Sequence, residues 1–240
     1  MPAPPRRPAV YGHRGASAHA PENTIEAIEL AFAQGAEGVE IDVRGTADGV
    51  LVLSHDPVHP AVGVLASVRF STLRRLAPEI PTLAEALAAI PAGGEVDVEI
   101  KNEPGEEDFD PLRRLVPPTL ATIRDAGVLD RVVVSSFDPV TMDLVRRADE
   151  TVATAQLLEP GIDPVRVAPW VVRAGHDALA LPVPALAGDG RRVVEELHRL
   201  GLGVVVWTVD DPELVRAVAD YGVEVIITND PAGAIAALEA

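Results

Sequence analysis

The sequence predicts a single-domain α/β protein with the TIM (β/α)8 barrel fold, and three observations carry this prediction. Short segments rich in Val and Ile alternate along the whole chain with amphipathic stretches of helical spacing. Eight such units can be counted in 240 residues. A (β/α)8 barrel usually needs about 250 residues. A doubly wound open sheet is the alternative, but it rarely needs so many evenly spaced units.

The eight predicted strands each contain a cluster of aliphatic residues. They are Val10–Gly12, Gly38–Arg44, Val96–Lys101, Val132–Phe137, Val152–Leu158, Ala178–Pro182, Val204–Val209 and Val225–Thr228. The predicted helices between them include Ile25–Gln34, Leu83–Ile90, Leu112–Asp125, Val140–Ala148, Val193–Leu200 and Leu214–Tyr221. Apolar residues recur three and four positions apart in these helices, so each can pack one face on the sheet.

Residues typical of helix ends agree with these boundaries. Asn23 is expected to cap the first helix, with Glu26 three residues further on. Asp138 and Asp211 each precede a proline, which is the usual order of a cap and a first-turn residue. Glycines follow four predicted helix ends, at Gly35, Gly127, Gly201 and Gly222.

We expect one barrel domain over residues 9–240, preceded by a flexible segment rich in Pro and Arg at 1–8. A turn at 46–49 should lead back into a short extended run. A short irregular insertion, 57–80, follows this second strand region and contains a helical piece near Ser71–Leu76.

Composition excludes several classes of protein. Hydrophobic residues make up 48% of the chain, so a real core can form. The absence of cysteine excludes disulfides, thiolate metal sites and cysteine nucleophiles. The net charge of −17 would repel nucleic acid. Because neither a signal-peptide pattern nor an apolar run of about 18 residues is present, we expect a cytoplasmic protein without stable membrane association. The oligomeric state stays unknown.

Charged and apolar residues alternate in two of the predicted strands, so the charged residues of each strand share one face. These are Glu40, Asp42 and Arg44 in the second strand and Asp97, Glu99 and Lys101 in the third. A polar face in water is the commoner explanation for a lone strand of this kind. In a parallel barrel, however, helices cover the outside. The charged set must then point inward, where carboxylates need partners or a metal.

This acidic cluster predicts a metal site near the carboxyl ends of the strands, where barrel active sites form. The carboxylates of Glu40, Asp42 and Glu99 are hard oxygen ligands suited to Mg²⁺, Ca²⁺ or Mn²⁺. Arg44 could instead neutralise the cluster in an ion-pair network without metal, and this alternative stays open. Asp97 lies deeper in its strand and is expected to be structural.

Two histidines lie at predicted strand ends. His13 is flanked by glycines that allow a tight turn and close approach of a ligand, and His55 ends the extended run after the turn. With Arg14 and Lys101, they supply an acid, a base and two fixed cations beside the acidic cluster. These parts suit cleavage of a phosphate ester. The other four histidines are expected to be surface or core residues.

Short motifs at these positions resemble the signature of the glycerophosphodiester phosphodiesterase family. The resemblance covers nearly the whole chain in order, and five of the motifs recur at family-like spacing within 13–56. The motifs are His13-Arg14-Gly15, Pro21-Glu22-Asn23-Thr24, Glu40-Ile41-Asp42-Val43, Asp48-Gly49, His55-Asp56, Val98-Glu99-Ile100-Lys101, Ser135-Ser136-Phe137, Trp207-Thr208-Val209 and Thr228-Asn229-Asp230-Pro231.

The resemblance implies a TIM barrel that hydrolyses a small glycerophosphodiester to an alcohol and glycerol 3-phosphate with a divalent cation, Mg²⁺, Ca²⁺ or Mn²⁺. It also implies a role for each matching residue. The acid/base pair would be His13 and His55, the phosphate contacts Arg14 and Lys101, the metal ligands Glu40, Asp42 and Glu99, and the substrate pocket would include Phe137 and Trp207.

Three positions depart from the family pattern. The insertion 57–80 is smaller than the lobe that many members carry, so the cap over the alcohol group should be small. Asp210 stands where an Asn often follows Trp-Thr-Val, and the segment 228–230 is one residue longer than the usual Thr-Asp. Both lie on late strands and are expected to face the substrate and influence the choice of head group.

Two other functions stay open. One is a related phosphodiesterase that acts on lysophospholipids or another phosphodiester with the same machinery. The other is a barrel that binds a phosphorylated ligand without catalysis. The presence of both histidines and all three carboxylates favours an enzyme over this second alternative.

Overall fold

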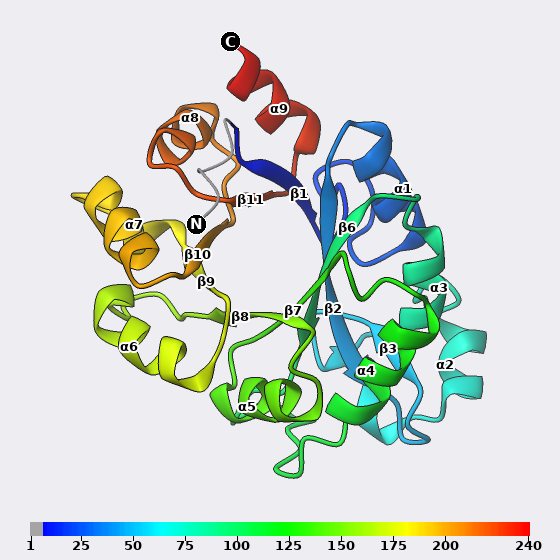
Figure 1. The fold of residues 1–240 in the computed structure, drawn as a ribbon. Coiled ribbons are helices and arrows are strands. Elements are labelled where there is room, and N and C mark those ends of the chain that lie inside the picture. Colours follow the sequence, from blue (N-terminus) through cyan, green and yellow to red (C-terminus); the bar gives the residue numbers. More distant parts are fainter. Residues whose placement is uncertain (1–6) are drawn as a thin grey trace.

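Eight parallel strands close into a ring in the computed structural model, which describes residues 7–240 (Figure 1). They are β1 (Ala9–His13), β2 (Gly38–Gly45), β6 (Glu95–Ile100), β7 (Val132–Ser136), β8 (Ala153–Leu157), β9 (Ala178–Pro182), β10 (Gly203–Trp207) and β11 (Val225–Thr228). The ring closes because β1 pairs with both β2 and β11. The predicted TIM barrel is therefore confirmed. Of the expected N-terminal segment, 1–6 lie outside the described residues.

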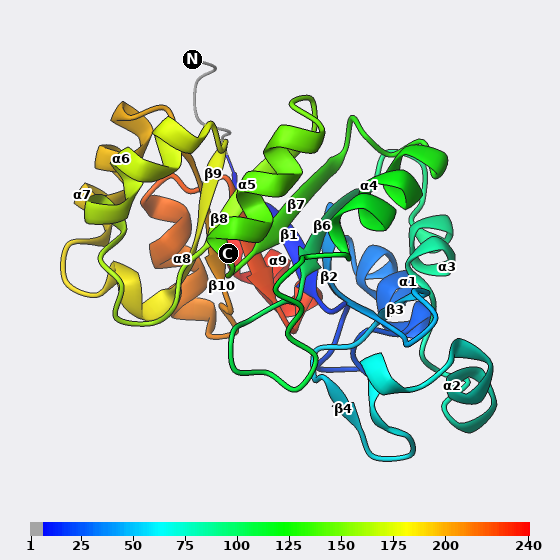
Figure 2. The ribbon, with the colours of Figure 1, turned by 90° about the horizontal axis from the view of Figure 1, so that it is seen from below.

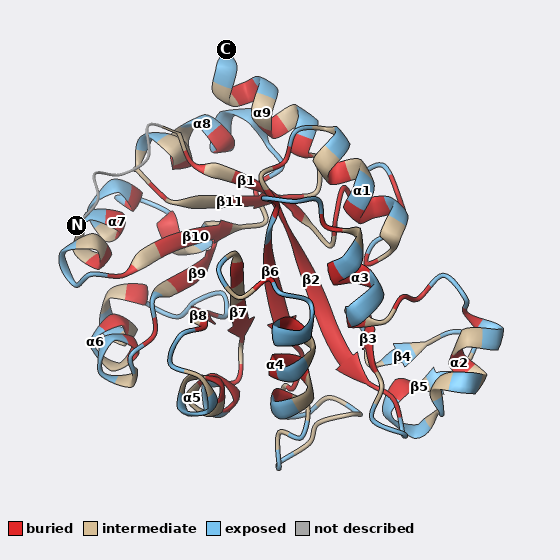
Figure 3. Ribbon diagram, turned by 45° about the vertical axis from the view of Figure 1, so that its right-hand side comes forward, coloured by how far each residue is buried: buried red, intermediate tan, exposed pale blue. Residues whose placement is uncertain are grey.

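Each strand of the ring is followed by a helix that packs against its outer face. These helices are α1 (Ile25–Ala33), α3 (Leu83–Ala89), α4 (Val116–Asp125), α5 (Pro139–Ala148), α6 (Pro164–Ala174), α7 (Gly190–Arg199), α8 (Pro212–Asp220) and α9 (Pro231–Glu239). Their buried residues face the ring and their exposed residues face outward (Figure 3). Within residues 7–240, no helix is both long enough and apolar enough to cross a membrane.

The core lies mainly between the ring and the helices and is aliphatic. Ile41 on β2 and Val98 on β6 are fully buried there and belong to one cluster with Ile28 of α1. Tyr11 and Ile227 belong to a smaller cluster formed by other side chains of the ring strands. The alternation of the sequence therefore has a direct cause, because the apolar positions of β2 and β6 face the helices and the charged positions face the inside of the barrel.

The segment after β2 folds around a small core of its own. β3 (Leu51–Leu53) runs antiparallel to the end of β2, and β4 (Val58–His59) pairs with β5 (Gly63–Val64) in a second, small sheet. The helical turn η1 (Leu65–Ser67) and α2 (Phe70–Leu76) follow. Figure 2 shows this insertion projecting from the same end of the barrel as the loop after β6. Its buried aliphatic residues are Val52, Leu65, Leu73, Ala77 and Ile80.

The helix ends confirm some predictions and correct two. Asp138 and Asp211 cap α5 and α8 as expected. Thr24, not Asn23, caps α1, because its hydroxyl accepts a hydrogen bond from the backbone N–H of Ala27 at 3.2 Å.

The second correction concerns the start of α4, which begins at Val116 and not at Leu112. The Asn102 side chain closes the loop before it, accepting a hydrogen bond from the Asp110 N–H at 2.8 Å. Arg113 then adopts a left-handed backbone conformation with φ of 50° and pairs with Asp138. These contacts hold the residues up to Arg113 outside the helix.

Gly15 allows the loop after β1 to lie against α1. Its φ is +84°, and a Cβ atom at this position would lie 2.4 Å from the carbonyl carbon of Ala27. Gly49, in the turn between β2 and β3, has a similar φ of +77° but no atom within 4 Å of a Cβ. The two glycines therefore share the backbone conformation and differ in the space around it.

We predict that Gly15→Ala lowers the free energy of unfolding more than Gly49→Ala. Both substitutions force an L-residue into the left-handed region, at a cost of about 1–2 kcal/mol. Only Gly15→Ala adds a backbone clash, which raises the expected loss to about 3 kcal/mol or more. Urea denaturation of the two variants measures the difference. Equal losses would show that the contact with α1 does not require glycine.

Candidate active site

A pocket of about 240 Å³ lies inside the ring and is lined by residues from the carboxyl ends of several strands. This is the end at which barrel enzymes carry their active sites. All predicted site residues except Asp42, which is buried beside the pocket, line it. These lining residues are His13, Arg14, Glu40, His55, Glu99, Lys101, Phe137 and Trp207.

The register of neighbouring strands brings the acidic residues together. Glu40 on β2 lies beside His13 of β1 and beside Asp97 of β6. Two residues further on, Asp42 lies beside Glu99. Ligand oxygens of Glu40, Asp42 and Glu99 all lie within 4.8 Å of one another, and all three residues are buried. The charged face of β2 therefore lies inside the barrel, and its interpretation as a solvent-facing surface is wrong.

Two cations lie close to this acidic cluster, which consists of Glu40, Asp42 and Glu99. The Lys101 Nζ lies 2.8 Å from Glu99 Oε1 and 3.9 Å from Asp42 Oδ1. The Arg14 Nε lies 3.1 Å from Asp42 Oδ2. Although burial favours the protonated carboxyl, Lys101 and Arg14 hold the pKa of Asp42 below its ordinary value. Asp42 is therefore the ionised centre of the cluster.

Glu40 and Glu99 are less well compensated. Burial and the charges of Asp42 and Glu99 raise the pKa of Glu40 well above its ordinary value. Burial and the charge of Asp42 raise the pKa of Glu99 to about 8 despite the nearby Lys101. The Oε1 atom of Glu40 is buried and accepts no hydrogen bond. An unpartnered carboxylate oxygen within a set of hard ligands fits a divalent cation.

Arg44 does not neutralise this cluster, so the ion-pair alternative through Arg44 is wrong. Its side chain is fully buried and forms ion pairs with Asp108 at 2.7 Å and Glu106 at 2.8 Å, both in the loop after β6. Its Nε atom donates a hydrogen bond to the His55 carbonyl at 2.8 Å. Arg44 thus joins the loop after β6 to the segment that carries His55.

The two histidines have different partners. His13 Nδ1 lies 2.7 Å from Asn229 Oδ1, and its Nε2 lies 4.0 Å from Glu40 Oε2. Burial and the adjacent Arg14 lower the pKa of His13. His55 is more exposed, and its Nδ1 lies 2.7 Å from Asp56 Oδ1. Each ring is therefore held through its Nδ1 atom by a neighbouring side chain.

Phe137 and Trp207 form an apolar wall of the pocket. Their rings meet edge to face with centroids 5.6 Å apart. The Lys101 ammonium lies 5.5 Å from the centroid of the Phe137 ring. The pocket therefore places an apolar surface beside its cations, an arrangement that suits an organic phosphate.

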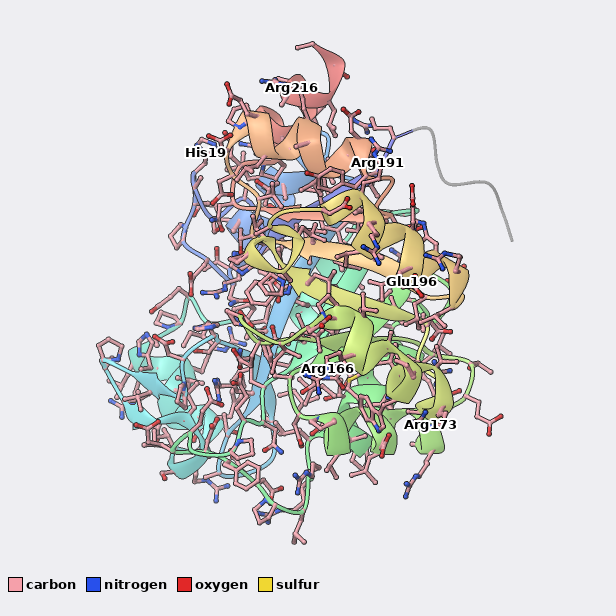
Figure 4. All side chains as sticks on the ribbon, turned by 90° about the vertical axis from the view of Figure 1, so that its left-hand side faces the viewer. His19, Arg166, Arg173, Arg191, Glu196 and Arg216 are labelled. Carbon is pink, nitrogen blue, oxygen red and sulfur yellow. The ribbon has the colours of Figure 1, made fainter. Side chains whose placement is uncertain are left out.

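The arginines labelled in Figure 4 belong to the outer helices and not to the pocket. Arg166 and Arg173 lie on α6, Arg191 on α7 and Arg216 on α8 (Figure 4). Among the described residues that line the pocket, Arg14 and Lys101 are the only Lys or Arg side chains. The fixed positive charge at the pocket wall therefore comes from these two side chains.

Two further side chains, Asn23 and Asp97, support the site through buried hydrogen bonds. Asn23, predicted to be a helix cap, instead donates from Nδ2 to Asp42 Oδ2 at 2.8 Å and accepts from the Asp42 N–H at 3.1 Å. The position of Asn23 within the Pro-Glu-Asn-Thr motif was the one feature of the sequence that pointed to a role at the site. Asp97 accepts a hydrogen bond from Ser135 at 2.6 Å. Burial raises the pKa of Asp97 to about 7.

Asp210 and Asn229 were expected to face the substrate. Neither is among the described residues that line the pocket. Asn229 contacts His13 instead, and Asp210 contacts Asn229. Asp210 is held by Thr228 and Asn229 at the end of β11, and Asn229 by His13 and Ser17, so both side chains belong to this hydrogen-bond chain and not to the pocket wall.

The site now defines a class of protein. A closed parallel barrel whose pocket combines an acidic cluster, two cations and two histidines is an enzyme fold equipped for a phosphorylated substrate. These side chains lie on or directly after β1, β2 and β6 and on the segment after β3.

Comparison with known proteins identifies the family. The model of the glycerophosphoryl diester phosphodiesterase family matches residues 13–233. The chain is 29% identical over 244 residues to a glycerophosphodiester phosphodiesterase of Caldanaerobacter subterraneus, covering 92% of this chain and 94% of the relative. This chain belongs to the glycerophosphoryl diester phosphodiesterase family, whose members are phosphoric diester hydrolases.

Crystal structures of glycerophosphodiester phosphodiesterases share the fold. The structure from Thermotoga maritima superposes with a TM-score of 0.80 at 26% identity, covering 94% of this chain and 96% of the other. The structure from Parabacteroides distasonis superposes with a TM-score of 0.83 at 25% identity, covering 97% of each chain. The likeness therefore extends over the whole barrel and is not confined to the motifs.

We predict that, without added metal, Glu99 makes the protein less stable as the pH rises. The pKa of Glu99 is about 8 in the folded protein, above the ordinary value of 4.5. Between these values the folded state keeps a proton that the unfolded state releases. Protonated Glu99 therefore stabilises the folded state at acidic pH, and this contribution to the free energy of unfolding is lost as the pH rises toward about 8.

Urea denaturation in EDTA at constant ionic strength tests this prediction. The free energy of unfolding should fall less steeply with pH in Glu99→Gln than in the wild type. Glu195→Gln, which removes an exposed carboxylate from α7, is the matched control and should keep the wild-type slope. A Glu99→Gln slope equal to that of the wild type would contradict the shifted pKa.

Proposed function

We propose that this protein hydrolyses glycerophosphodiesters to an alcohol and glycerol 3-phosphate, with a divalent cation and two histidines as its catalytic groups. The observation that carries the proposal is the meeting of three elements in one pocket: the buried acidic cluster, the cations Arg14 and Lys101, and the histidines His13 and His55. Membership of the family supplies the substrate class.

The two cations would bind the phosphodiester anion. Arg14 presents a planar guanidinium that suits bidentate contact with phosphate oxygens, and Lys101 acts as a point charge. Both are already oriented by carboxylates, Arg14 by Asp42 and Glu22 and Lys101 by Glu99. The phosphate would therefore meet cations whose positions are set before it binds.

Glu40, Asp42 and Glu99 would hold the divalent cation. Mg²⁺, Ca²⁺ and Mn²⁺ all accept three carboxylate ligands of this kind. When bound, such a cation supplies charge stabilisation to the phosphoryl oxygens. The unpartnered Oε1 of Glu40 and the raised pKa of Glu99 support this assignment, because a cation would satisfy both carboxylates.

The histidines would move the protons. One histidine takes the proton of the nucleophile while the oxygen of the nucleophile bonds to phosphorus. The other histidine protonates the leaving alkoxide while the P–O bond to that alkoxide breaks. Each transfer contributes about 10²–10⁴ in rate. The nucleophile is either water, which gives glycerol 3-phosphate directly, or the glycerol hydroxyl of the substrate, which gives a cyclic phosphate whose ring P–O bond water then cleaves. Phosphorus NMR of the reaction distinguishes the two, because only the second route forms the cyclic species.

An apolar pocket adjoining the site favours a second class of substrate. It has a volume of about 480 Å³ and shares Phe137, Leu157 and Glu159 with the catalytic pocket. Val140, Ile162 and Trp170 complete much of its wall. This surface could hold an apolar group, so lysophospholipids are the second candidate. Their turnover relative to glycerophosphocholine separates the two classes.

We predict that His13→Ala and His55→Ala each lose at least about 10²-fold in kcat while keeping the fold. The assay is release of glycerol 3-phosphate from glycerophosphocholine and glycerophosphoethanolamine, first with EDTA and then with Mg²⁺, Ca²⁺ or Mn²⁺ added. His198→Ala is the control, because His198 pairs with Glu224 away from the pocket. A His13 or His55 variant with near-normal kcat would remove that residue from the mechanism.

We predict that Glu40→Gln weakens binding of Mn²⁺ by at least about 10-fold, because an amide oxygen carries no charge for the ion. Isothermal titration of the metal-free protein with MnCl₂ measures this directly and does not depend on turnover. Glu195→Gln again serves as the control. Unchanged Mn²⁺ affinity in Glu40→Gln would show that the acidic cluster is not the metal site.

A further inference from the structure

A chain of hydrogen bonds reaches His13 from the ends of β10 and β11. The Asn229 Oδ1 lies 2.7 Å from His13 Nδ1 and accepts a hydrogen bond from the Ser17 hydroxyl, also at 2.7 Å. The Asn229 Nδ2 donates to Asp210 Oδ2 at 2.6 Å. The other oxygen of Asp210 accepts from the Asn229 N–H at 2.8 Å and from the Thr228 hydroxyl at 3.0 Å.

These contacts determine which way the Asn229 amide points. An ionised carboxylate can only accept hydrogen bonds, so the NH₂ group of Asn229 must face Asp210. The amide oxygen then faces His13 and can only accept. The hydrogen of a neutral His13 ring must therefore lie on Nδ1, which leaves a lone pair on Nε2. That atom lies 4.0 Å from Glu40 Oε2, on the side of the acidic cluster.

From this geometry we infer that Asp210 and Asn229 are positioning residues that hold His13 in its Nδ1–H tautomer, with the Nε2 lone pair directed into the pocket. In this state His13 is ready to accept a proton before it can donate one. Asn229 orients the ring through its amide oxygen, which can only accept a hydrogen bond. The catalytic consequence rests on the proposed function, whereas the tautomer is a property of the folded chain.

Asp210→Asn should invert the arrangement. The new amide oxygen would keep the hydrogen bonds from the Asn229 N–H and the Thr228 hydroxyl, which leaves its NH₂ group facing that of Asn229. Two NH₂ groups that face each other cannot form a hydrogen bond. The Asn229 amide must therefore rotate so that the NH₂ group of Asn229 faces His13. The ring nitrogen Nδ1 must then accept, and the hydrogen moves to Nε2. We expect kcat to fall about 10²-fold, with KM changed little, because the Nε2 atom that faces the pocket then carries a hydrogen and cannot accept a proton.

Exchanging the two residues should restore the tautomer. In Asp210→Asn/Asn229→Asp, the carboxylate at 229 accepts from the amide at 210, from Ser17 and from His13 Nδ1–H. We expect the double variant to recover kcat to within about 10-fold of the wild type. Because residues 210 and 229 contact each other, their substitutions are not expected to add, so rescue of folding alone does not separate a positioning role from a structural one; the position of the hydrogen on the His13 ring does.

The test combines nitrogen NMR with kinetics. Protein labelled with ¹⁵N-histidine is studied without metal at about pH 8, where an ordinary imidazole is neutral, and the His13 signals are assigned by their loss in His13→Ala. Asp220→Asn, an exposed aspartate at the end of α8, is the matched control for both measurements. Asn229→Leu removes the acceptor without changing Asp210 and should give a mixture of tautomers, so the test does not depend on Asp210→Asn folding.

The expected result is Nδ1–H in the wild type and the double variant and Nε2–H in Asp210→Asn, with kcat following the tautomer. The inference is overturned if Asp210→Asn keeps both the Nδ1–H tautomer and wild-type kcat, or if the double variant is no better than Asp210→Asn. If the wild type releases no glycerol 3-phosphate with any metal, the proposed function fails. The NMR measurement still decides the tautomer in that case.

Discussion

The burial of three carboxylates inside a parallel barrel is the constraint on which the site depends. Helices cover the outside of the ring, so the charged faces of β2 and β6 can only turn inward, where an ionised carboxylate needs partners. Asp42 obtains them from Lys101 and Arg14. Glu99 shares Lys101 and Glu40 accepts a hydrogen bond from the Arg14 N–H, but burial and the neighbouring carboxylates outweigh these contacts and raise the pKa values of both. The protein alone leaves this cluster incompletely compensated, which is the condition that favours a divalent cation.

The pocket is held in shape by residues that bridge separate loops. Asn23 joins the loop after β1 to Asp42, and Arg44 joins the His55 segment to the loop after β6. Asn229 joins the end of β11 to His13. Each bridge fixes a reactive side chain or its backbone to a different strand of the ring. Geometry set in this way before the substrate binds is what makes charged groups effective in catalysis.

The sequence revealed the inward charges but not their partners. The alternation in 39–44 and 96–101 has a period of two, so the shared face follows from strand geometry alone. The partners depend on contacts across the fold. From its place in the strand, Arg44 was expected to neutralise the neighbouring carboxylates. It instead pairs with Glu106 and Asp108, which lie 62 and 64 residues away in the sequence. Asn23 resembled a cap because asparagine often precedes a helix, whereas its amide holds Asp42, 19 residues away.

The same reasoning applies to the hydrogen-bond chain that supports His13. A hydrogen-bond chain of an amide and a carboxylate has a direction, because the carboxylate only accepts. With Asp at 210, the residue at 229 must be able to donate to it, and Asn229 does. With Asn at 210, a carboxylate at 229 would accept from both that amide and His13. Either pair leaves the hydrogen on Nδ1 of His13, so the identity of one residue constrains the other through the ring that both support.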